Sequence, residues 1–156
     1  MIYVFDTSSF RELFHFYPKR FPTLWQSFQN LIENEQILSV KEVFREMSVG
    51  GRDHPDTQWD REHKRIFKEP SAEEAQFISE IFRVEHFQQS LEKKKLLRGG
   101  YFADPFIIAS AKVNSATVVT QERFKQNGTK IPNICDRFEV SCINLEELME
   151  AEGWEF

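Results

Sequence analysis

The sequence contains few of the residues on which several large classes of proteins depend. Only two of its 156 residues are cysteines, Cys135 and Cys142, which is too few for a disulfide framework or a cysteine-rich zinc site. No apolar run is long enough to span a bilayer, and the first apolar run ends at Asp6, where a secretory signal would continue. We therefore expect a cytoplasmic protein that does not associate with membranes.

Positive charge is also in deficit. Lysine and arginine number 20 against 25 acidic residues, so the formal net charge is −5. This balance excludes a nucleic-acid binder that is basic over its whole surface, although it leaves room for a local basic patch. Apolar residues are plentiful, at 40% with 16 phenylalanines, and they suffice for a hydrophobic core. We assign residues 1–156 to a single domain.

Short apolar runs alternate along the chain with segments of helical periodicity. Strands that alternate with helices predict an α/β domain around a mainly parallel sheet. The predicted strands are 2–5, 37–40, 116–120 and 141–143. The predicted helices are 22–33, a segment after Val40, a polar segment before Phe67, 71–97, a segment from Asp104 and 145–152. Loops are expected over 6–9 and 49–57.

Capping residues set the ends of two of these helices. Ser71 and Glu74 form the pattern of a capping box at the start of one helix, and Gly99-Gly100 is expected to end it. Asp104-Pro105 predicts another helix start, with the carboxylate as N-cap and proline in the first turn.

Acidic side chains follow the predicted strands, at the edge of the sheet where ligands bind in parallel α/β folds. Asp6 comes directly after the first strand, Glu122 lies just beyond the third, and Asp104 begins a buried helix. A fourth acid is Glu46 or Glu42, which lie one turn apart on the helix after the second strand. The spacing therefore predicts acids from separate parts of the chain at one edge.

Each of these acids has an ordinary structural interpretation when it is considered alone. Asp6 could form an Asx turn, Asp104 could act only as a helix cap, and the glutamates could be solvated. Together they indicate a shared cleft, in which carboxylates repel one another and need a positive partner. Mg²⁺ or Mn²⁺ supplies that charge, because hard cations prefer oxygen ligands.

Four motifs occur in the order seen in PIN-domain nucleases. They are YVFDTSS at the start of the chain, SVKEVFREM after the second strand, ADPFIIASA and VVTQERF. The chain resembles that family along nearly its whole length, most specifically over residues 1–50 and 101–125. The resemblance implies a PIN-like three-layer sandwich, with a central, mainly parallel sheet flanked by helices. It also implies the activity of a metal-dependent endoribonuclease.

The same resemblance implies roles for the acids. Asp6, Glu46 and Asp104 match the family's three principal acids, and Glu122 stands where a fourth, usually aspartate, is found. We prefer Glu46 to Glu42 because the family's acid follows an apolar pair. The four acids would hold Mg²⁺ or Mn²⁺ for phosphodiester hydrolysis, which would leave a 5′-phosphate and a 3′-hydroxyl.

Partners also follow from the resemblance. The similar nucleases are toxins of bacterial or archaeal toxin–antitoxin pairs, so RNA is the implied substrate and a cognate antitoxin protein is the implied partner. A homodimer is compatible with this interpretation. Around the acids we assign substrate contacts to three hydroxyl residues, Thr7, Ser8 and Thr120.

A cluster of basic residues precedes the ADPFIIASA motif. Lys93, Lys94 and Lys95 are followed by Arg98, and Arg123 lies beyond the third predicted strand. We call these five residues the basic lip. Lysines near the end of a helix are usually a solvated face that the helix dipole favours. The functional alternative is that the basic lip holds RNA phosphates beside the metal.

Two other functions stay open. An inactive PIN-like module could bind RNA or a protein without cutting, although the presence of all four acids argues against it. A DNA-directed nuclease could use the same metal chemistry, which does not involve the 2′-hydroxyl. Zinc-protease chemistry is not expected, because His15, His54, His63 and His86 show no HExxH spacing and suit surface positions.

Overall fold

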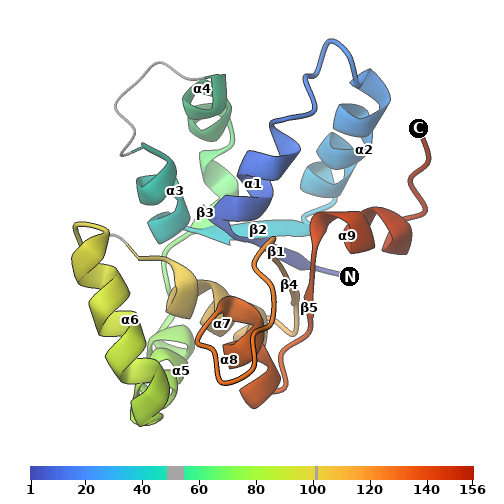
Figure 1. The fold of residues 1–156 in the computed structure, drawn as a ribbon. Coiled ribbons are helices and arrows are strands. Elements are labelled where there is room, and N and C mark those ends of the chain that lie inside the picture. Colours follow the sequence, from blue (N-terminus) through green and yellow to red (C-terminus); the bar gives the residue numbers. More distant parts are fainter. Residues whose placement is uncertain (49–54, 101) are drawn as a thin grey trace.

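Five short parallel strands form the centre of the fold (Figure 1). The structure is a computed structural model that describes residues 1–48, 55–100 and 102–156. Helices cover both faces of the sheet, so the predicted α/β sandwich with a parallel sheet is confirmed. The strands of the described residues are β1 (Tyr3–Phe5), β2 (Ile37–Val40), β3 (Phe67–Lys68), β4 (Thr117–Val119) and β5 (Cys142–Ile143).

Helices make up the two outer layers. In Figure 1, α1 and α2 lie on one side of the sheet, and α5, α7 and α8 lie on the other. The helices of the described residues are α1 (Thr7–Leu13), α2 (Pro22–Glu33), α3 (Lys41–Ser48), α4 (Pro55–Glu62), α5 (Ala72–Arg83), α6 (Glu85–Leu97), α7 (Asp104–Val113), α8 (Ile131–Arg137), α9 (Leu145–Ala151) and the short 3₁₀ helix η1 (Lys64–Ile66).

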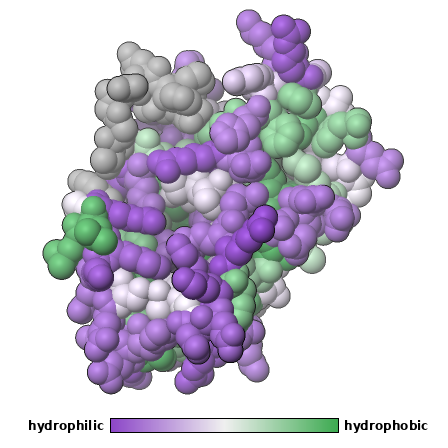
Figure 2. Space-filling model, viewed as in Figure 1, coloured by the Kyte–Doolittle hydropathy of each residue, from purple (hydrophilic) through white to green (hydrophobic). Residues whose placement is uncertain are grey.

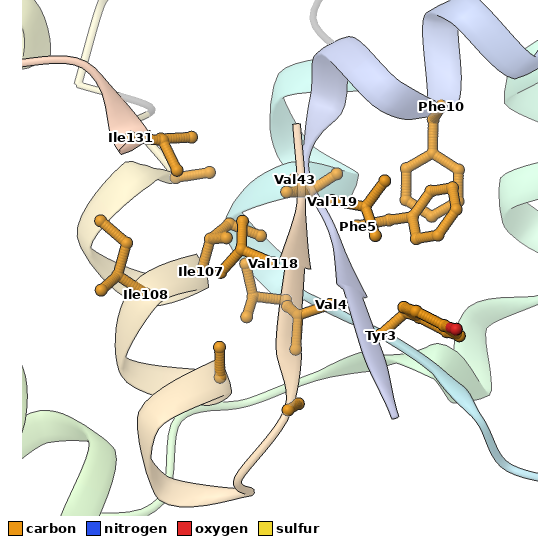
Figure 3. Packing of buried hydrophobic residues seen from close by; sticks show 14 of the residues in the cluster. Tyr3, Val4, Phe5, Phe10, Val43, Ile107, Ile108, Val118, Val119 and Ile131 are labelled. Atoms are coloured by element: carbon orange, nitrogen blue, oxygen red, sulfur yellow. The ribbon is translucent and has the colours of Figure 1, made fainter. Parts of the chain in front are cut away.

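The central strands are apolar on both faces. All residues of β1 and β4 are buried. The ring of Phe5 packs against Phe10 of α1 and Phe28 of α2, with centroid distances of 5.1 and 5.5 Å. Val4 points to the opposite side, where Ile107 of α7 lies (Figure 3). Since side chains alternate along a strand, a strand covered on both faces is mostly apolar, and Thr117 of β4 is the polar exception in these two strands.

The order of the strands creates a topological switch point between β1 and β4. From β1 the chain moves outward through β2 to β3, and it then returns to place β4 and β5 on the other side of β1. The segments that leave β1 and β4 therefore turn in opposite directions and open a crevice at the carboxyl ends of these strands. Asp6 directly follows β1 and Thr120 directly follows β4, so both lie at this crevice.

Three elements were not predicted from the sequence: α1, β3 and α8. The residues after β1 were expected to form a loop, but Asp6 accepts a hydrogen bond from the amide of Ser9 and starts α1 at once. At the edge of the sheet, β3 has two residues, which is too short for a periodic signal. These corrections leave the fold class unchanged.

Two further predictions are corrected in part. Ser71 caps α5 as predicted, but that helix ends at Arg83, and extended backbone at Val84 separates it from α6. Within the predicted loop 49–57, Pro55 already begins α4, and residues 49–54 lie outside the described residues.

The face of the molecule seen in Figure 2 is mainly hydrophilic. Nowhere in the described ranges is a helix long and apolar enough to cross a membrane.

Candidate active site

A cleft of about 610 Å³ lies at the carboxyl ends of β1 and β4. Its walls come from α1 and the residues at its two ends, from Glu46 of α3, from Arg98 and Ala103, from the first residue of α7 and from the loop after β4. The structure brings all four predicted acids to this cleft: Asp6, Glu46, Asp104 and Glu122.

Asp6 is held by a full set of hydrogen bonds. The residue is only 5% exposed. Its carboxylate accepts the amide of Ser9 at 2.8 Å and the hydroxyl of Thr120 at 2.6 Å. The Ser8 hydroxyl lies 2.8 and 2.9 Å from its two oxygens. Burial raises the pKa of Asp6, while these hydrogen bonds favour the carboxylate and oppose that rise. Both oxygens of Asp6 are therefore engaged within the protein.

Glu46 is the acid of α3 that faces the cleft. Its Oε2 accepts the amide of Ala103 at 2.9 Å. Its Oε1 accepts the Thr7 hydroxyl at 3.2 Å and lies 3.5 Å from a guanidinium nitrogen of Arg98. Burial raises the pKa of Glu46 more than these three donors lower it. Glu46 thus joins α3 to α1 and to the start of α7.

Glu42 lies one turn earlier on α3 and does not reach the cleft. It forms an ion pair with Arg45 and lines a separate cavity of about 390 Å³. The placement of the two side chains agrees with the preference for Glu46.

Asp104 is as buried as Asp6, but its hydrogen bonds are incomplete. It is 5% exposed, and its Oδ2 is buried without a hydrogen-bond partner. The predicted N-cap role is wrong. Ala103 is the N-cap of α7, so Asp104 is already inside the helix, one position beyond the place from which a side chain reaches the first free amides.

The electrostatic surroundings of Asp104 favour its neutral form. Burial is the largest cause of a pKa well above the ordinary range for aspartate, and the charge of Glu122 adds to it. Lys94 and Arg98 act in the opposite direction without cancelling the rise. Asp104 is therefore a buried carboxyl group that the protein leaves short of positive partners.

Glu122 is bound to the start of α8. Its Oε2 accepts the amide of Ile131 at 2.9 Å, and its own amide donates to the hydroxyl of Thr120 at 3.1 Å. Its negative charge raises the pKa of both Asp6 and Asp104. Glu122 thus interacts electrostatically with the two buried aspartates from the loop side of the cleft.

The cleft offers oxygen donors of the kind that hard divalent cations prefer, but they are not gathered around one point. Among the described residues, no group of three or more His, Cys, Asp or Glu side chains is arranged to hold a metal ion. Asp6, Glu46 and Glu122 are instead turned toward amide or hydroxyl donors. Asp104 Oδ2 is the exception, a buried acceptor that still needs a partner. The donor set therefore fits Mg²⁺ or Mn²⁺ in kind.

The three hydroxyl residues predicted to contact substrate all donate hydrogen bonds to acidic residues of the cleft. Thr7 donates to Glu46, and Thr120 and Ser8 donate to Asp6. Ser8 and Thr120 also accept the amides of Gln121 and Glu122. Through these bonds the loop after β4 is tied to the acid that follows β1.

The structure divides the basic lip. Arg98 lines the cleft, and Lys94 lies one turn earlier on the same face of α6. Lys95 lines the separate cavity instead. Lys93 and Arg123 are exposed and do not line the cleft. Only part of the predicted cluster therefore adjoins the acids.

Sequence reasoning missed five residues of the cleft wall. Arg11, Glu12 and His15 line it from α1 and its end, Ala103 from the start of α7, and Gln121 from the loop after β4. The three residues of the first group were missed because the residues after β1 were expected to form a loop. Once α1 is recognised, the helical spacing of Thr7 and Arg11 places both side chains on one face.

Comparisons with known proteins identify a family but assign no activity. No curated protein matches the sequence significantly. A similar solved structure is the crystal structure of PAE2754 from Pyrobaculum aerophilum, with a TM-score of 0.47 and 16% sequence identity. The match covers 97% of this chain and 88% of that one. A family model described as "Domain of unknown function (DUF4411)" matches residues 3–156, and the chain belongs to this family.

Proposed function

We propose that the protein is a Mg²⁺- or Mn²⁺-dependent endoribonuclease with a PIN-like active site. The observation that carries the proposal is Asp104 Oδ2, which is buried and has no hydrogen-bond partner among the described residues, in a cleft that is also lined by Asp6, Glu46 and Glu122. Retaining such a group costs stability, because a buried acceptor without a partner has lost its hydration. A cation that binds there would offset that cost.

The predicted acids would share the cation. Asp104 and Asp6 would bind it directly, Glu46 directly or through water, and Glu122 would serve a second cation that arrives with substrate. When bound, such a cation supplies a more acidic water and positive charge for the transition state of phosphodiester hydrolysis. The expected products carry a 5′-phosphate and a 3′-hydroxyl.

The other residues of the cleft would keep these acids in place. Ser8 and Thr120 hold Asp6 at the end of β1, and the amide of Ala103 holds Glu46. Since each acid is anchored to a different element, the site forms only when the whole edge of the sheet is folded. Lys94 and Arg98 would hold the phosphates of the RNA at the mouth of the cleft.

The similarity to toxin-type nucleases also suggests a role for the protein in the cell. We propose that the protein acts in the cytoplasm as a toxin, and that an antitoxin protein encoded beside it neutralises it. Co-expression with the product of an adjoining small gene, followed by purification of the complex, tests this part separately from catalysis.

The test of the activity uses purified protein stripped of metal with EDTA. Addition of Mn²⁺ or Mg²⁺ should start cleavage of 5′-labelled structured RNAs, and Asp104→Asn should not cut. The matched control is Glu42→Gln, which removes an acid of α3 that does not line the cleft. RNA that binds without being cut would favour the inactive module, and preferential cutting of DNA would favour the DNA-directed nuclease.

A further inference from the structure

Arg98 pairs with an acid that the proposed cation would also need. We propose that Arg98 and the divalent cation exchange places at Glu46, so that the released guanidinium binds a phosphate of the RNA. This inference rests on the proposed function and adds a positioning role for Arg98 that depends on the cation.

Glu46 has little capacity left for a cation while Arg98 is in place. Its side chain is only 11% exposed. Oε2 accepts the amide of Ala103 at 2.9 Å. Oε1 accepts the Thr7 hydroxyl at 3.2 Å and lies 3.5 Å from Arg98 Nη1. A carboxylate oxygen has about two acceptor sites, so Thr7 and Arg98 fill those of Oε1, and one site remains on Oε2. Release of Arg98 would let a cation bind through both oxygens.

Arg98 and a divalent cation would also repel each other at this distance. Both carry positive charge, and a cation bound to Glu46 would lie within a few ångströms of the guanidinium in a partly buried site, where charges are weakly screened. Arg98 therefore acts as the counter-charge of Glu46 without metal, and cation binding favours its release.

Arg98 is free to leave, whereas its neighbour Lys94 is fixed. The Arg98 side chain is 47% exposed and follows the last residue of α6. The pair is long, at 3.5 Å, and a cation bound to Glu46 would replace the positive charge that Arg98 supplies, so its release would leave no unpaired buried carboxylate. Lys94 Nζ donates to the carbonyl of Thr129 at 3.0 Å, which ties it to the loop that precedes α8. Among the described residues, Arg98 forms an ion pair with a carboxylate of the cleft and Lys94 does not.

The released guanidinium would remain at the mouth of the cleft. Its central carbon lies 5.3 Å from the ring centre of Phe102, and Phe102 is buried, with 4% exposed. An aromatic ring attracts a guanidinium above it without occupying its N–H groups. The ring of Phe102 would therefore keep Arg98 near the cleft and leave its donors available. Its paired N–H groups match two oxygens of a phosphodiester. Cation binding would therefore prepare the cleft for RNA.

The first experiment measures Mn²⁺ binding by isothermal titration calorimetry, without RNA. Arg98→Gln should bind Mn²⁺ more tightly than the wild type, by about two- to fivefold, because the competing ion pair is gone. Arg11→Gln is the matched control. It removes the same charge from the same cleft, and Arg11 forms no ion pair with any residue that the structure describes. We expect a smaller change for this variant.

The second experiment measures binding of a short labelled RNA by fluorescence anisotropy, in EDTA and in Ca²⁺, which also takes oxygen ligands. Ca²⁺ should strengthen RNA binding by the wild type, and Arg98→Gln should lose most of this gain. Arg98→Lys, which keeps the charge but not the paired donors, should regain part of it.

The outcomes separate this inference from the proposed function. If the wild type binds no Mn²⁺ at millimolar concentrations, the proposed function fails. If it binds Mn²⁺, but Arg98→Gln and Arg11→Gln alter the affinity equally, only the exchange at Glu46 is overturned. A gain of RNA affinity in Ca²⁺ that persists in Arg98→Gln would also overturn it.

Discussion

Asp6 and Asp104 lie in the same cleft and are equally buried, but they differ in the hydrogen bonds that their carboxyl groups accept. Each is 5% exposed, and burial raises the pKa of both. Asp6 is surrounded by donors from Ser8, Ser9 and Thr120, whereas Asp104 has one oxygen with no partner. The comparison separates an acid that the fold holds in position from an acid whose partner must come from elsewhere.

The local sequence explains this difference. Asp6 follows β1 in extended backbone, from which its side chain reaches the amide of Ser9 in the first turn of α1. Asp104 already lies in α7, and the next residue, Pro105, has no amide hydrogen to donate. The amide of Ala103 is donated to Glu46. The two neighbours of Asp104 along the chain therefore provide no backbone donor for its side chain.

The largest expected effect is the loss of cleavage in Asp6→Asn and Asp104→Asn. Either substitution would remove a ligand of the proposed cation at nearly constant volume, so activity should fall by more than about 100-fold, the upper end of what indirect metal partners contribute. Rates of RNA cleavage in saturating Mn²⁺ measure this. Undiminished activity in purified Asp104→Asn would remove this residue from the site.

The next effect concerns the acids of α3 and the loop after β4. Glu46→Gln should lower activity by about 10- to 100-fold, while Glu42→Gln should behave as the wild type because Glu42 pairs with Arg45 outside the cleft. Glu122→Gln should lie between them. The same cleavage assay ranks the three variants. A dead Glu42→Gln beside a normal Glu46→Gln would reverse the assignment.

The sequence predicts the frame of the fold better than it predicts the site. Short buried runs bounded by polar residues give strands directly, and α2 and β2 begin and end where the pattern predicts. Helix α1 was missed because it is seven residues long and begins at an aspartate that also suits a turn. Short elements leave too few residues for periodicity to decide.

The sequence predicts that the four acids meet at one edge of the sheet, but it does not predict their hydrogen bonds and ion pairs. The positions of the acids after strands in a parallel sheet suffice to bring them to one edge. The contact between Arg98 and Glu46 joins the end of α6 to α3, and the unpaired oxygen of Asp104 depends on which donors the folded chain places around it. Neither can be found from sequence spacing, because both arise from tertiary packing.

The third prediction compares the stability of the two aspartate variants without metal. Asp104→Asn replaces a group whose ionisation the folded protein disfavours, and it removes no satisfied hydrogen bond of Oδ2, so it should melt above the wild type in EDTA. Asp6→Asn keeps one acceptor oxygen where the carboxylate accepts three donors, so it should be less stable than Asp104→Asn by about 1–3 kcal/mol. Thermal melts in EDTA and in millimolar Mn²⁺ measure both effects.

In the same melts, Mn²⁺ should raise the melting temperature of the wild type by binding the native state. Asp104→Asn should reduce that shift. If Asp104→Asn melts below the wild type in EDTA and keeps the full Mn²⁺ shift, the unpaired oxygen contributes nothing to cation binding, and the contrast with Asp6 is only structural.

A fourth prediction follows from the direction of the pKa shifts. Burial raises the pKa of Asp6, Glu46 and Asp104 in the folded protein. The folded state therefore binds more protons than the unfolded state at pH values between the unfolded and folded pKa. Without metal, the free energy of unfolding should increase as pH falls from neutral through the raised pKa values. Urea titrations in EDTA at several pH values measure this increase, which should be smaller in Asp104→Asn. An equal increase in that variant would show that other groups cause it.

The smallest effect is expected on RNA binding at the mouth of the cleft, where basic residues on two faces of α6 and its C-terminal end can be compared. Lys94 and Arg98 lie near the acids, and their charges lower the pKa of Asp104, whereas Lys93 is exposed and Lys95 lines the separate cavity. Replacing Lys94 and Arg98 with glutamine should therefore weaken RNA binding and flatten its salt dependence. Each lost phosphate contact changes the log–log slope by about 0.7 for single-stranded RNA, so the double variant should lose about 1.4.

The matched control, Lys93→Gln with Lys95→Gln, removes the same charge from the same helix and should change the slope much less. Anisotropy titrations of labelled RNA between 50 and 300 mM salt, at a constant concentration of Ca²⁺ that releases Arg98 from Glu46, measure both slopes. Equal slopes for the two double variants would mean that RNA is attracted by the overall charge of α6. In that case the pair beside Asp104 would only balance the acids of the cleft, and the two faces of the helix would not differ in function.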